Sequence, residues 1–186
     1  MIRNIVPLSS FIIFFFLFLN IHAAEHNWKP AKNGDKIILI RHSKAPGFGD
    51  PPGFKIKDCK TQRNLSMEGI NQSKKIGKLF KKNQIKIDQV LSSQWCRCKD
   101  TAKYAFKNFE EFQALNSTFQ PPYDKNAKKQ IKELKDFIQK WNGKGGNLVL
   151  VTHYVMITAI TDVVPRSGEI VIIDKNFKTL STILTN

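Results

Sequence analysis

Cysteine is scarce in this sequence, and its spacing excludes a structural zinc site. The chain has three cysteines, and a single residue separates Cys96 from Cys98. A structural zinc ion needs four ligands, so this pair is too short and too isolated to hold one. Three cysteines are typical of an exported protein with one disulfide and one spare thiol. We therefore predict that Cys59 is bridged to Cys96 or to Cys98, and the sequence leaves both pairings open.

Acidic residues are also scarce: the chain has 15 Asp and Glu against 30 Lys and Arg, and its formal net charge is +15. This excess predicts attraction to anionic partners such as phosphate esters, lipopolysaccharide-like surfaces, anionic lipid or nucleic acid. The lysines are scattered and are not interleaved with aromatic residues. We therefore interpret them as a solvated cationic face and expect no specific nucleic-acid partner. Peripheral contact with an anionic membrane surface stays open, and steeply salt-dependent binding would indicate it.

The sequence has no apolar run that suits a permanent membrane anchor, which usually needs about 18 or more apolar residues. Its longest run, from Ile5 to Leu19, is rich in phenylalanine but is interrupted by a proline and two serines. A basic residue, Arg3, precedes the run and two small residues, Ala23 and Ala24, follow it, which is the layout of a secretory signal peptide. No cysteine follows the run, which argues against a lipid anchor. We predict that cleavage near Ala23 or Ala24 removes residues 1–24 and yields a periplasmic or secreted protein.

Residues 25–186 show no internal repeat and no second domain, and they suffice for one domain with a sizeable core. After a polar lead-in at residues 25–35, short apolar segments alternate with segments of helical periodicity. We predict strands at residues 36–41, 89–92, 111–115, 147–152, 169–173 and 178–184, and helices at residues 67–82, 98–109, 125–141 and 154–163. This alternation predicts an α/β fold: a three-layer sandwich with a mainly parallel central sheet, helices on both faces and a C-terminal hairpin.

The first long helix has a clear start signal. Ser66 suits the N-cap position, and Glu68 stands in the first turn, where the helix dipole favours an acid. We expect Met67, Ile70, Gly77 and Phe80 to lie on or near one face of this helix.

Basic and imidazole side chains follow three of the predicted strands. Arg41 and His42 come directly after a buried apolar run, His153 follows another, and Arg97 lies near the start of a helix beyond a third. Ligands of open α/β sheets bind at the carboxyl ends of strands, so we expect these four side chains to converge at one rim of the sheet. Arginine binds phosphate through planar, bidentate hydrogen bonds, and the lack of a carboxylate cluster argues against a metal site.

Residues 43–64 have no regular periodicity and are rich in proline and glycine. A loop of this length in a compact domain is usually functional or disordered. Its position after His42 predicts a wall or lid of the site, with Phe48 and Phe54 as an apolar pocket wall. Arg63, near the end of the loop, can line the rim or stay solvated.

Four segments of the chain also resemble the motifs of a known family. They are Leu39-Ile40-Arg41-His42, Leu65-Ser66-Met67-Glu68-Gly69, Ser92-Ser93 with Arg97 and Thr101-Ala102, and Val151-Thr152-His153. Together they resemble the histidine phosphatase superfamily, whose best-known relatives are cofactor-dependent phosphoglycerate mutases and acid phosphatases. The resemblance extends from residue 36 to about residue 174.

The resemblance implies a role for each matched residue. His42 would be the nucleophile and would form a phosphohistidine that water hydrolyses, and it has to be neutral to attack. Arg41, Arg97 and His153 would bind the phosphoryl oxygens, without a metal or any other cofactor. Relatives commonly have glycine where this chain has Ser43, whose hydroxyl could contact phosphate or fill space.

The proton donor for the leaving group has no clear match. Relatives supply a Glu or Asp, and the candidates are Asp50, Glu110, Glu111 and Asp124, each of which we expect at the surface. If none of them serves, good substrates are those whose leaving group needs little protonation, such as activated esters or phosphoramidates.

The sequence as a whole predicts an exported, metal-independent phosphatase that hydrolyses phosphate monoesters. The alternative is a non-catalytic protein that binds phosphate or lipopolysaccharide in the same basic pocket. A mutase is less favoured, because export removes the chain from cytosolic sugar phosphates. The expected substrate is a phosphorylated small molecule or an envelope glycan or lipid, and the sequence does not give the oligomeric state.

Overall fold

The computed structural model describes residues 27–143 and 145–185, so the predicted signal peptide, residues 1–24, lies outside the described residues. Its centre is a six-stranded sheet with the order β3-β2-β4-β1-β5-β6. The strands are β1 Ile37–Arg41, β2 Ile87–Ser92, β3 Glu110–Glu111, β4 Asn147–Thr152, β5 Ile170–Ile173 and β6 Thr179–Ile183. The longer helices are α2 Met67–Lys82, α3 Cys96–Phe106, α4 Ala127–Lys140 and α5 Tyr154–Thr161. In this part of the chain, every helix is too short or too polar to cross a bilayer.

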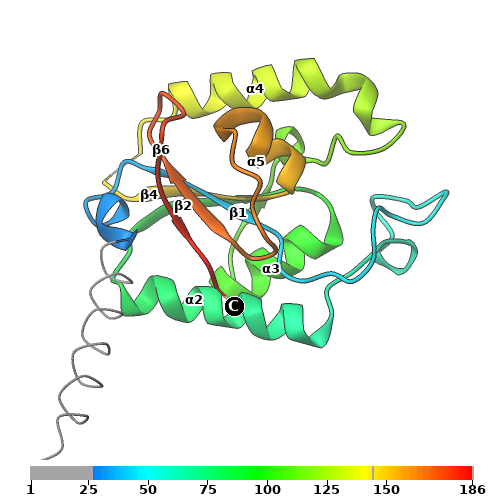
Figure 1. Ribbon diagram of the computed structural model, residues 1–186, viewed down its shortest axis with the longest axis horizontal. Helices are drawn as coiled ribbons and strands as arrows, with labels where there is room; N and C mark the ends of the chain where they lie inside the picture. The colour runs from blue at the N-terminus through cyan, green and yellow to red at the C-terminus, as the bar shows by residue number, and fades with distance from the viewer. Residues whose placement is uncertain (1–26, 144, 186) are drawn as a thin grey trace, which may run out of the picture.

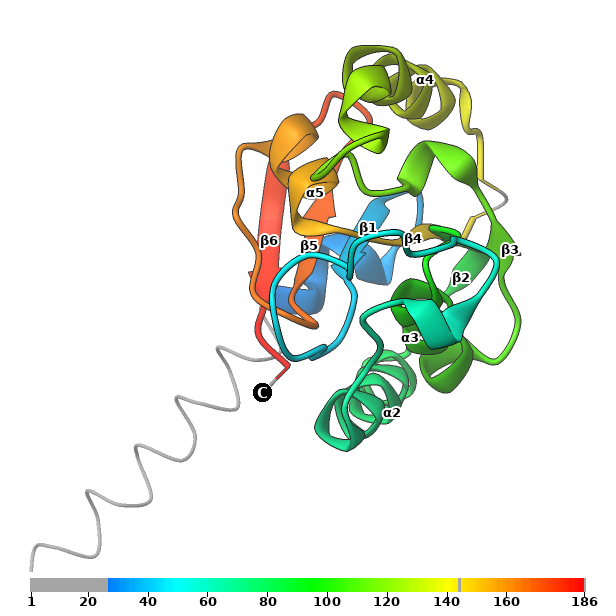
Figure 2. The same cartoon turned by 90° about the vertical axis from the view of Figure 1, so that its right-hand side faces the viewer.

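The sheet is mainly parallel. β3, β2, β4 and β1 pair in parallel, whereas β5 is antiparallel to both β1 and β6 and forms the C-terminal hairpin with β6. α2 and α3 cover one face of the sheet, and α4 and α5 cover the other (Figure 1). Figure 2 looks along the layers and shows the loop of residues 43–64, in cyan, across the near end of the sheet. The predicted three-layer α/β sandwich is confirmed.

Alternation along the two central strands divides the core into two clusters. Ile38 and Ile40 of β1 pack with the residues of α2 and α3, whereas Ile37 and Leu39 pack with those of α4 and α5. β4 is divided in the same way. Each fully buried Ile or Leu contributes roughly 1.5–3 kcal/mol relative to an exposed one, so these two strands fix the sheet in the centre of the molecule.

Helix α2 begins where the sequence predicts, but its buried face differs in part. Ser66 Oγ accepts a hydrogen bond from Gly69 N at 3.1 Å, which is the N-cap geometry. The buried residues are Gly69, Ser73, Ile76, Gly77 and Phe80. Of the four residues expected on or near one face, Gly77 and Phe80 are buried and Ile70 is half-buried, whereas Met67 is 70% exposed. A β-carbon on Gly77 would lie 2.2 Å from Ala105 O, so close backbone approach of α2 and α3 selects the glycine-containing face.

Other differences lie at the ends of elements. The lead-in contains a short helix, residues 27–32, because Trp28 packs edge-on against Phe80 with 5.1 Å between ring centroids. The predicted strand at residues 111–115 is only Glu110–Glu111, followed by the 3₁₀ helix Gln113–Leu115. Helix α3 begins at Cys96, two residues before the predicted start, and ends three residues earlier.

A disulfide joins the loop of residues 43–64 to helix α3. Cys59 lies in the 3₁₀ helix Cys59–Thr61, and its partner is Cys96, the first residue of α3. This resolves the pairing that the sequence left open, and Cys98 is a free, buried thiol. The bridge fixes the loop beside Arg97, which directly follows Cys96.

Replacement of Cys59 by serine is expected to lower the free energy of unfolding by about 4 kcal/mol. The bridge spans 37 residues, and a cross-link over a loop of that length lowers the conformational entropy of the unfolded chain. That loss of entropy stabilises the folded state by about 4 kcal/mol relative to the unfolded chain. Chemical unfolding of the variant beside wild type measures the change. Lys60→Ser, at an exposed neighbour outside the bridge, is the control. A loss below about 1 kcal/mol would show that the loop is held in place without the bridge.

Candidate active site

His42 and His153 meet at the carboxyl ends of two adjacent strands. β1 and β4 are parallel, and Arg41 is in register with Thr152, so the residues that follow them are neighbours. His42 N donates a hydrogen bond to Thr152 O at 2.9 Å. The two imidazole centroids are 5.5 Å apart, and each histidine is 2% exposed. The predicted convergence of the two histidines is therefore confirmed.

The environment of His42 leaves one ring nitrogen free to attack. Its Nδ1 lies 2.8 Å from Ser43 O, and a carbonyl only accepts, so Nδ1 carries the proton and the lone pair of the neutral ring is on Nε2. Burial, followed by the positive charge of Arg97, lowers the pKa of His42 well below its ordinary value. The ring is therefore neutral at physiological pH, as a nucleophile requires.

His153 is fixed by a chain of hydrogen bonds. Its Nε2 is 2.9 Å from Ser93 Oγ, and that hydroxyl is 3.1 Å from Asn116 Oδ1. Because the amide oxygen only accepts, Ser93 donates to Asn116 and accepts from His153, which leaves Nδ1 of His153 for a ligand. Burial and then the charge of Arg97 lower the pKa of His153 well below its ordinary value. A bound phosphoryl dianion would raise that pKa and favour donation from Nδ1.

The two predicted arginines, Arg41 and Arg97, both line the same pocket as the histidines. The Nε atoms of both guanidinium groups are buried and have no hydrogen-bond partner among the described residues. Buried donors of this kind are rare in native proteins, because each costs the free energy of its lost hydration. Because both residues line the pocket, their guanidinium groups can bind phosphoryl oxygens there.

Arg63 brings a third guanidinium to the pocket. Its Nε donates to Gly49 O at 2.7 Å, and its NH1 donates to Ala45 O, so it binds the loop back on itself. Burial and the nearby charge of Arg97 lower the pKa of Arg63 below its ordinary value. The sequence left open whether Arg63 lines the rim or is solvated, and the structure shows that it lines the pocket.

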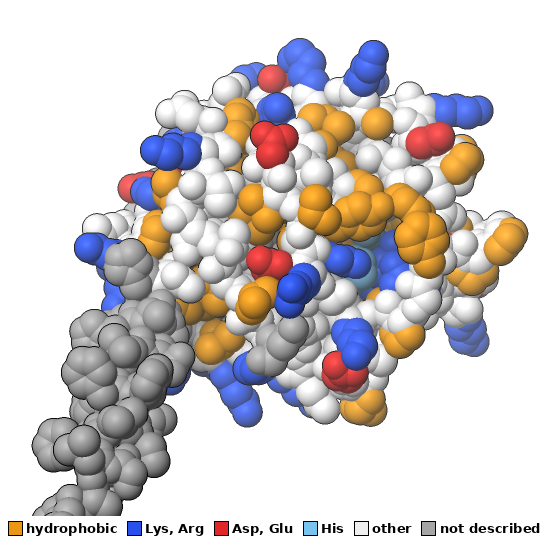
Figure 3. Space-filling view, viewed as in Figure 1, with side chains coloured by type: hydrophobic (Ala, Val, Ile, Leu, Met, Phe, Trp, Pro, Cys, Tyr) orange, Lys and Arg blue, Asp and Glu red, His pale blue; other side chains and the backbone are white. Residues whose placement is uncertain are grey.

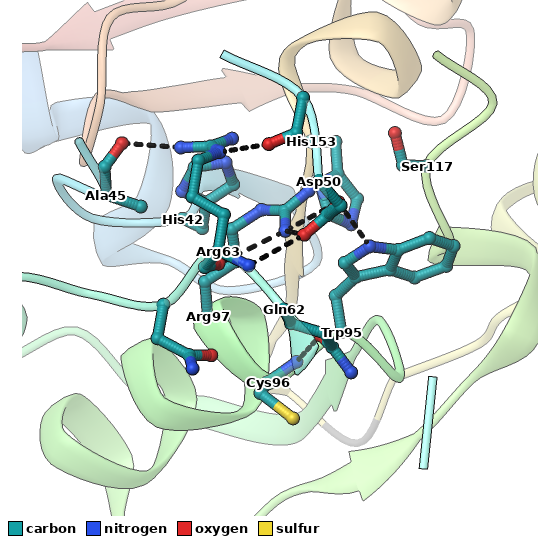
Figure 4. A network of polar contacts seen from close by, with 12 residues as sticks. His42, Ala45, Asp50, Gln62, Arg63, Trp95, Cys96, Arg97, Ser117 and His153 are labelled. Atoms are coloured by element: carbon teal, nitrogen blue, oxygen red, sulfur yellow. Dashed lines mark hydrogen bonds and ion pairs between the residues drawn. The ribbon is translucent and has the colours of Figure 1, made fainter. Parts of the chain in front are cut away.

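Asp50 is the carboxylate of this pocket, and the prediction that it lies at the surface is wrong. Its side chain is 3% exposed and accepts hydrogen bonds from Arg97 at 2.8 Å and from Trp95 Nε1 at 2.9 Å (Figure 4). Burial alone would raise the pKa of Asp50, but the hydrogen bond and charge of Arg97 hold it below its ordinary value. In this arrangement the carboxyl group is ionised at neutral pH and has no proton to give.

The remaining predicted donors do not reach the site. Glu110 and Glu111 are exposed on β3, where Glu111 pairs with Lys99 at 3.0 Å, and Asp124 is also exposed. None of the three lines the pocket.

Ser43 also lies outside the pocket lining. Its hydroxyl is 2.8 Å from the hydroxyl of Ser73 on α2, and its backbone N donates to Thr101 Oγ1 at 3.0 Å. This position favours a packing role for Ser43, in which its side chain fills space between β1 and the helices, over a contact with phosphate.

The pocket is small, with a volume of about 80 Å³, and aromatic side chains surround its mouth. Figure 3 shows a hollow with histidine and basic side chains inside and hydrophobic side chains at its border. Phe48 lines this pocket as predicted, but Phe54 packs against Trp95 and Tyr123. A larger groove of about 620 Å³ between α2 and α3 contains lysines and apolar side chains but no histidine or arginine, so it cannot carry the chemistry described above.

The two buried histidines predict how stability depends on pH. Each has an ordinary pKa of 6.5 that is strongly lowered in the folded protein, so below pH 6.5 the unfolded chain binds protons that the folded chain does not. This contribution to stability is complete above pH 6.5 and is lost as pH falls from there toward the folded values. We expect the melting temperature to decrease between pH 7 and pH 5, with about 1 kcal/mol per pH unit lost for each histidine.

Calorimetry of wild type and His153→Asn across this range measures the effect. The variant lacks one of the two groups and should show about half the dependence, and equal dependence in both proteins would contradict the assignment. Asp50 does not contribute in this range, because its lowered pKa places its titration at more acidic pH.

The comparisons with known proteins give structural neighbours only. No family model matches the chain, and no curated protein matches it. Among solved structures, the protein histidine phosphatase SixA complexed with tungstate has a TM-score of 0.57 at 12% identity, covering 81% of this chain and 97% of its own.

Two further solved structures support the same fold. A candidate phosphohistidine phosphatase SixA from Agrobacterium tumefaciens has a TM-score of 0.58 at 17% identity, with 81% of this chain and 97% of its own covered. A mutant phosphoserine phosphatase from Entamoeba histolytica in complex with phosphoserine has a TM-score of 0.52 at 16% identity, with coverages of 74% and 89%. The chain therefore has the fold of these phosphatases.

Proposed function

We propose that this protein is a metal-independent phosphatase of the histidine phosphatase superfamily, which hydrolyses phosphate monoesters through a phosphohistidine on His42. The observation that carries the proposal is the pocket itself. It combines a neutral imidazole with a free Nε2 and two buried guanidinium groups whose Nε atoms have no partner among the described residues. The shared fold supports the same chemistry.

The reaction takes place in two steps. In the first, the lone pair of His42 Nε2 forms a bond to phosphorus while the bond from phosphorus to the ester oxygen breaks, and the electron pair leaves with that oxygen. Arg41, Arg97 and His153 bind the other phosphoryl oxygens and stabilise the charge that spreads over them. In the second step water attacks phosphorus, the nitrogen–phosphorus bond breaks and inorganic phosphate leaves. The proton that water loses balances the one that the released alcohol gains.

A chromogenic assay tests the proposal. Purified protein is expected to hydrolyse 4-nitrophenyl phosphate at an undiminished rate in excess chelator, and a rapid acid-free quench should trap a phosphorylated His42, detected by mass spectrometry. Hydrolysis that stops in chelator would contradict metal independence. Turnover without any phosphohistidine would contradict the covalent route.

A second candidate function is a non-catalytic phosphate- or lipopolysaccharide-binding protein. The observation in its favour is that Asp50 already binds Arg97 and that the pocket contains no protonated carboxyl group. Stoichiometric binding of inorganic phosphate with no hydrolysis of any ester would favour this function over the first.

The variant Asp50→Asn distinguishes two roles for Asp50: positioning Arg97 and Trp95, or protonating the leaving group. Because Asp50 is ionised and positions Arg97 and Trp95, we expect aryl and alkyl phosphates to lose activity by the same factor, together with a loss of stability from the unpaired buried charge of Arg97. Loss of a general acid would instead cost about 10²–10⁴-fold, mainly for alkyl esters, whose leaving groups need a proton. Steady-state rates with both ester types measure the ratio, and Glu111→Gln on exposed β3 is the matched control.

The proposed location is the periplasm or the extracellular space. The disulfide between Cys59 and Cys96 supports an oxidising compartment, since such bridges are rare in the cytosol. Mass spectrometry of the protein from the producing cell tests export: a mature chain that begins near residue 25 is expected, and an intact N-terminus would contradict it.

The proposed substrates are phosphorylated small molecules or envelope glycans and lipids, and a panel of phosphate esters would identify the class.

A further inference from the structure

Three aromatic rings form a continuous wall at the mouth of the pocket. Phe48 meets Phe119 edge-on with 4.9 Å between ring centroids, and Phe119 lies 5.9 Å from Tyr154. The Arg41 guanidinium lies 5.4 Å from the centre of the Tyr154 ring, which connects this wall to the floor of the phosphate site. We call Phe48, Phe119 and Tyr154 the aromatic rim.

The side chain of Phe48 is exposed to solvent and can contact a bound ligand. It is 84% exposed, the highest value among the large hydrophobic side chains of the described residues. Gly47 and Gly49 flank it with φ angles of 90° and 67°, a left-handed backbone that favours glycine. An exposed ring beside a catalytic pocket gains free energy when a flat apolar group covers it.

The volume of the pocket indicates which part of a substrate reaches the rim. At about 80 Å³ the pocket is far smaller than the roughly 300 Å³ at which sites for whole small molecules begin. Only the phosphoryl group fits beside His42 and Arg97, so the leaving group lies at the mouth, against the aromatic rim.

The chemistry of the pocket restricts the leaving group independently. Asp50 is ionised and bound to Arg97, so no carboxyl group in the pocket is ready to protonate the departing atom. Efficient reaction then needs a leaving group that is stable as it departs and takes its proton from solvent. A phenol meets this condition far better than an aliphatic alcohol. An N-phosphorylated imidazole also meets it once solvent has protonated its other ring nitrogen, because it then leaves as neutral imidazole. Both leaving groups are flat rings.

We propose that the aromatic rim selects substrates in which phosphorus is bonded to an aromatic ring system, either an aryl phosphate or an N-phosphorylated imidazole. This inference rests on the proposed phosphatase function. As His42 Nε2 bonds to phosphorus, the bond from phosphorus to the ring's oxygen or nitrogen breaks, and the electron pair stays on that atom. A departing phenolate takes a proton from solvent, whereas an imidazole already protonated by solvent on its other nitrogen leaves as the neutral ring. Water then attacks phosphorus, the bond to His42 breaks, phosphate leaves and the proton that water loses goes to solvent.

Two esters of similar leaving-group acidity separate ring recognition from reactivity. We expect kcat/KM for phenyl phosphate to exceed that for hexafluoroisopropyl phosphate, and Phe48→Ala to reduce this preference by about two- to tenfold, the usual value of an aromatic pair. Met67→Ala removes another exposed apolar side chain, outside the pocket, and should leave the preference unchanged. Hydrolysis of both esters with no preference in wild type would overturn the inference and leave the proposed function intact.

A binding measurement keeps the two proposals distinguishable if no ester is hydrolysed. By calorimetry, phenylphosphonate is expected to bind wild type more tightly than methylphosphonate, and Phe48→Ala should weaken only the former. That result without turnover would overturn the catalytic proposal but support ring recognition by the rim. Equal affinities for the two phosphonates would overturn ring recognition.

Three phosphoamino acids distinguish the sources of the ring. Free phosphotyrosine carries a phenol, phosphohistidine an imidazole, and phosphoserine no ring. Faster hydrolysis of either ring compound than of phosphoserine supports the inference, and the faster of the two identifies the source. A phosphoserine rate equal to both would overturn it.

Discussion

The variant His42→Ala is expected to lose at least about 10⁴-fold in kcat, the scale seen when an enzyme loses its nucleophile. The reason is specific to this pocket. In the proposed mechanism the free Nδ1 of His153 binds a phosphoryl oxygen, and its ring centroid lies 5.5 Å from that of His42, so His153 does not take the place of the lost nucleophile. The measurement is kcat with 4-nitrophenyl phosphate for wild type and variant.

Chemical rescue provides the control for His42→Ala. Because the residue is buried, the variant leaves a space of the size of an imidazole ring beside Ser43. Added imidazole should enter this space and restore part of the turnover, whereas a misfolded variant would not respond. Full activity of His42→Ala without imidazole would reject His42 as the nucleophile.

The second large effect is expected for Arg97→Lys, with a fall in kcat/KM of about 10²–10³-fold, the usual cost of one lost donor to a developing oxyanion. Lysine keeps the charge but lacks the planar fork of donors, so it cannot bind Asp50 and a phosphoryl oxygen together. Arg166→Lys, at an exposed arginine, is the matched control and should be close to wild type.

A double variant distinguishes the two partners of Arg97. If Arg97→Lys acts only by leaving the buried Asp50 carboxylate poorly paired, then adding Asp50→Asn should recover most of the activity and stability. If Arg97 binds the phosphoryl group, the double variant should remain as slow as Arg97→Lys. We expect the second result, because Arg97 lines the same pocket as His42 and His153.

The sequence could predict the site wherever a strand positions the residue. Apolar runs before Arg41 and before His153 indicate buried strands, and the rule that ligands bind at their carboxyl ends brings both residues to one rim. The site residues that lie in the loop are harder to predict from sequence, because residues 43–64 have no periodicity that could indicate a contact. Asp50 reaches Arg97 across 47 positions of sequence, and its exposure could not be known without that partner.

The choice of partner for Cys59 and part of the buried face of α2 escaped prediction for a similar reason. The side chains of Cys96 and Cys98 point in different directions only once α3 has formed. Cys96 then faces the loop, and Cys98 faces β4. The position of α2 depends on the approach of Gly77 to Ala105, a contact between two helices that neither helix shows alone.

The free thiol of Cys98 has a practical consequence. It is fully buried, 3.4 Å from His153 Nε2, and burial raises its pKa to about 12. An alkylating reagent can therefore modify a native molecule only when α3 separates from β4 for a moment. The rate of that modification measures how often the candidate site opens, and it does so with a natural probe that requires no engineered label.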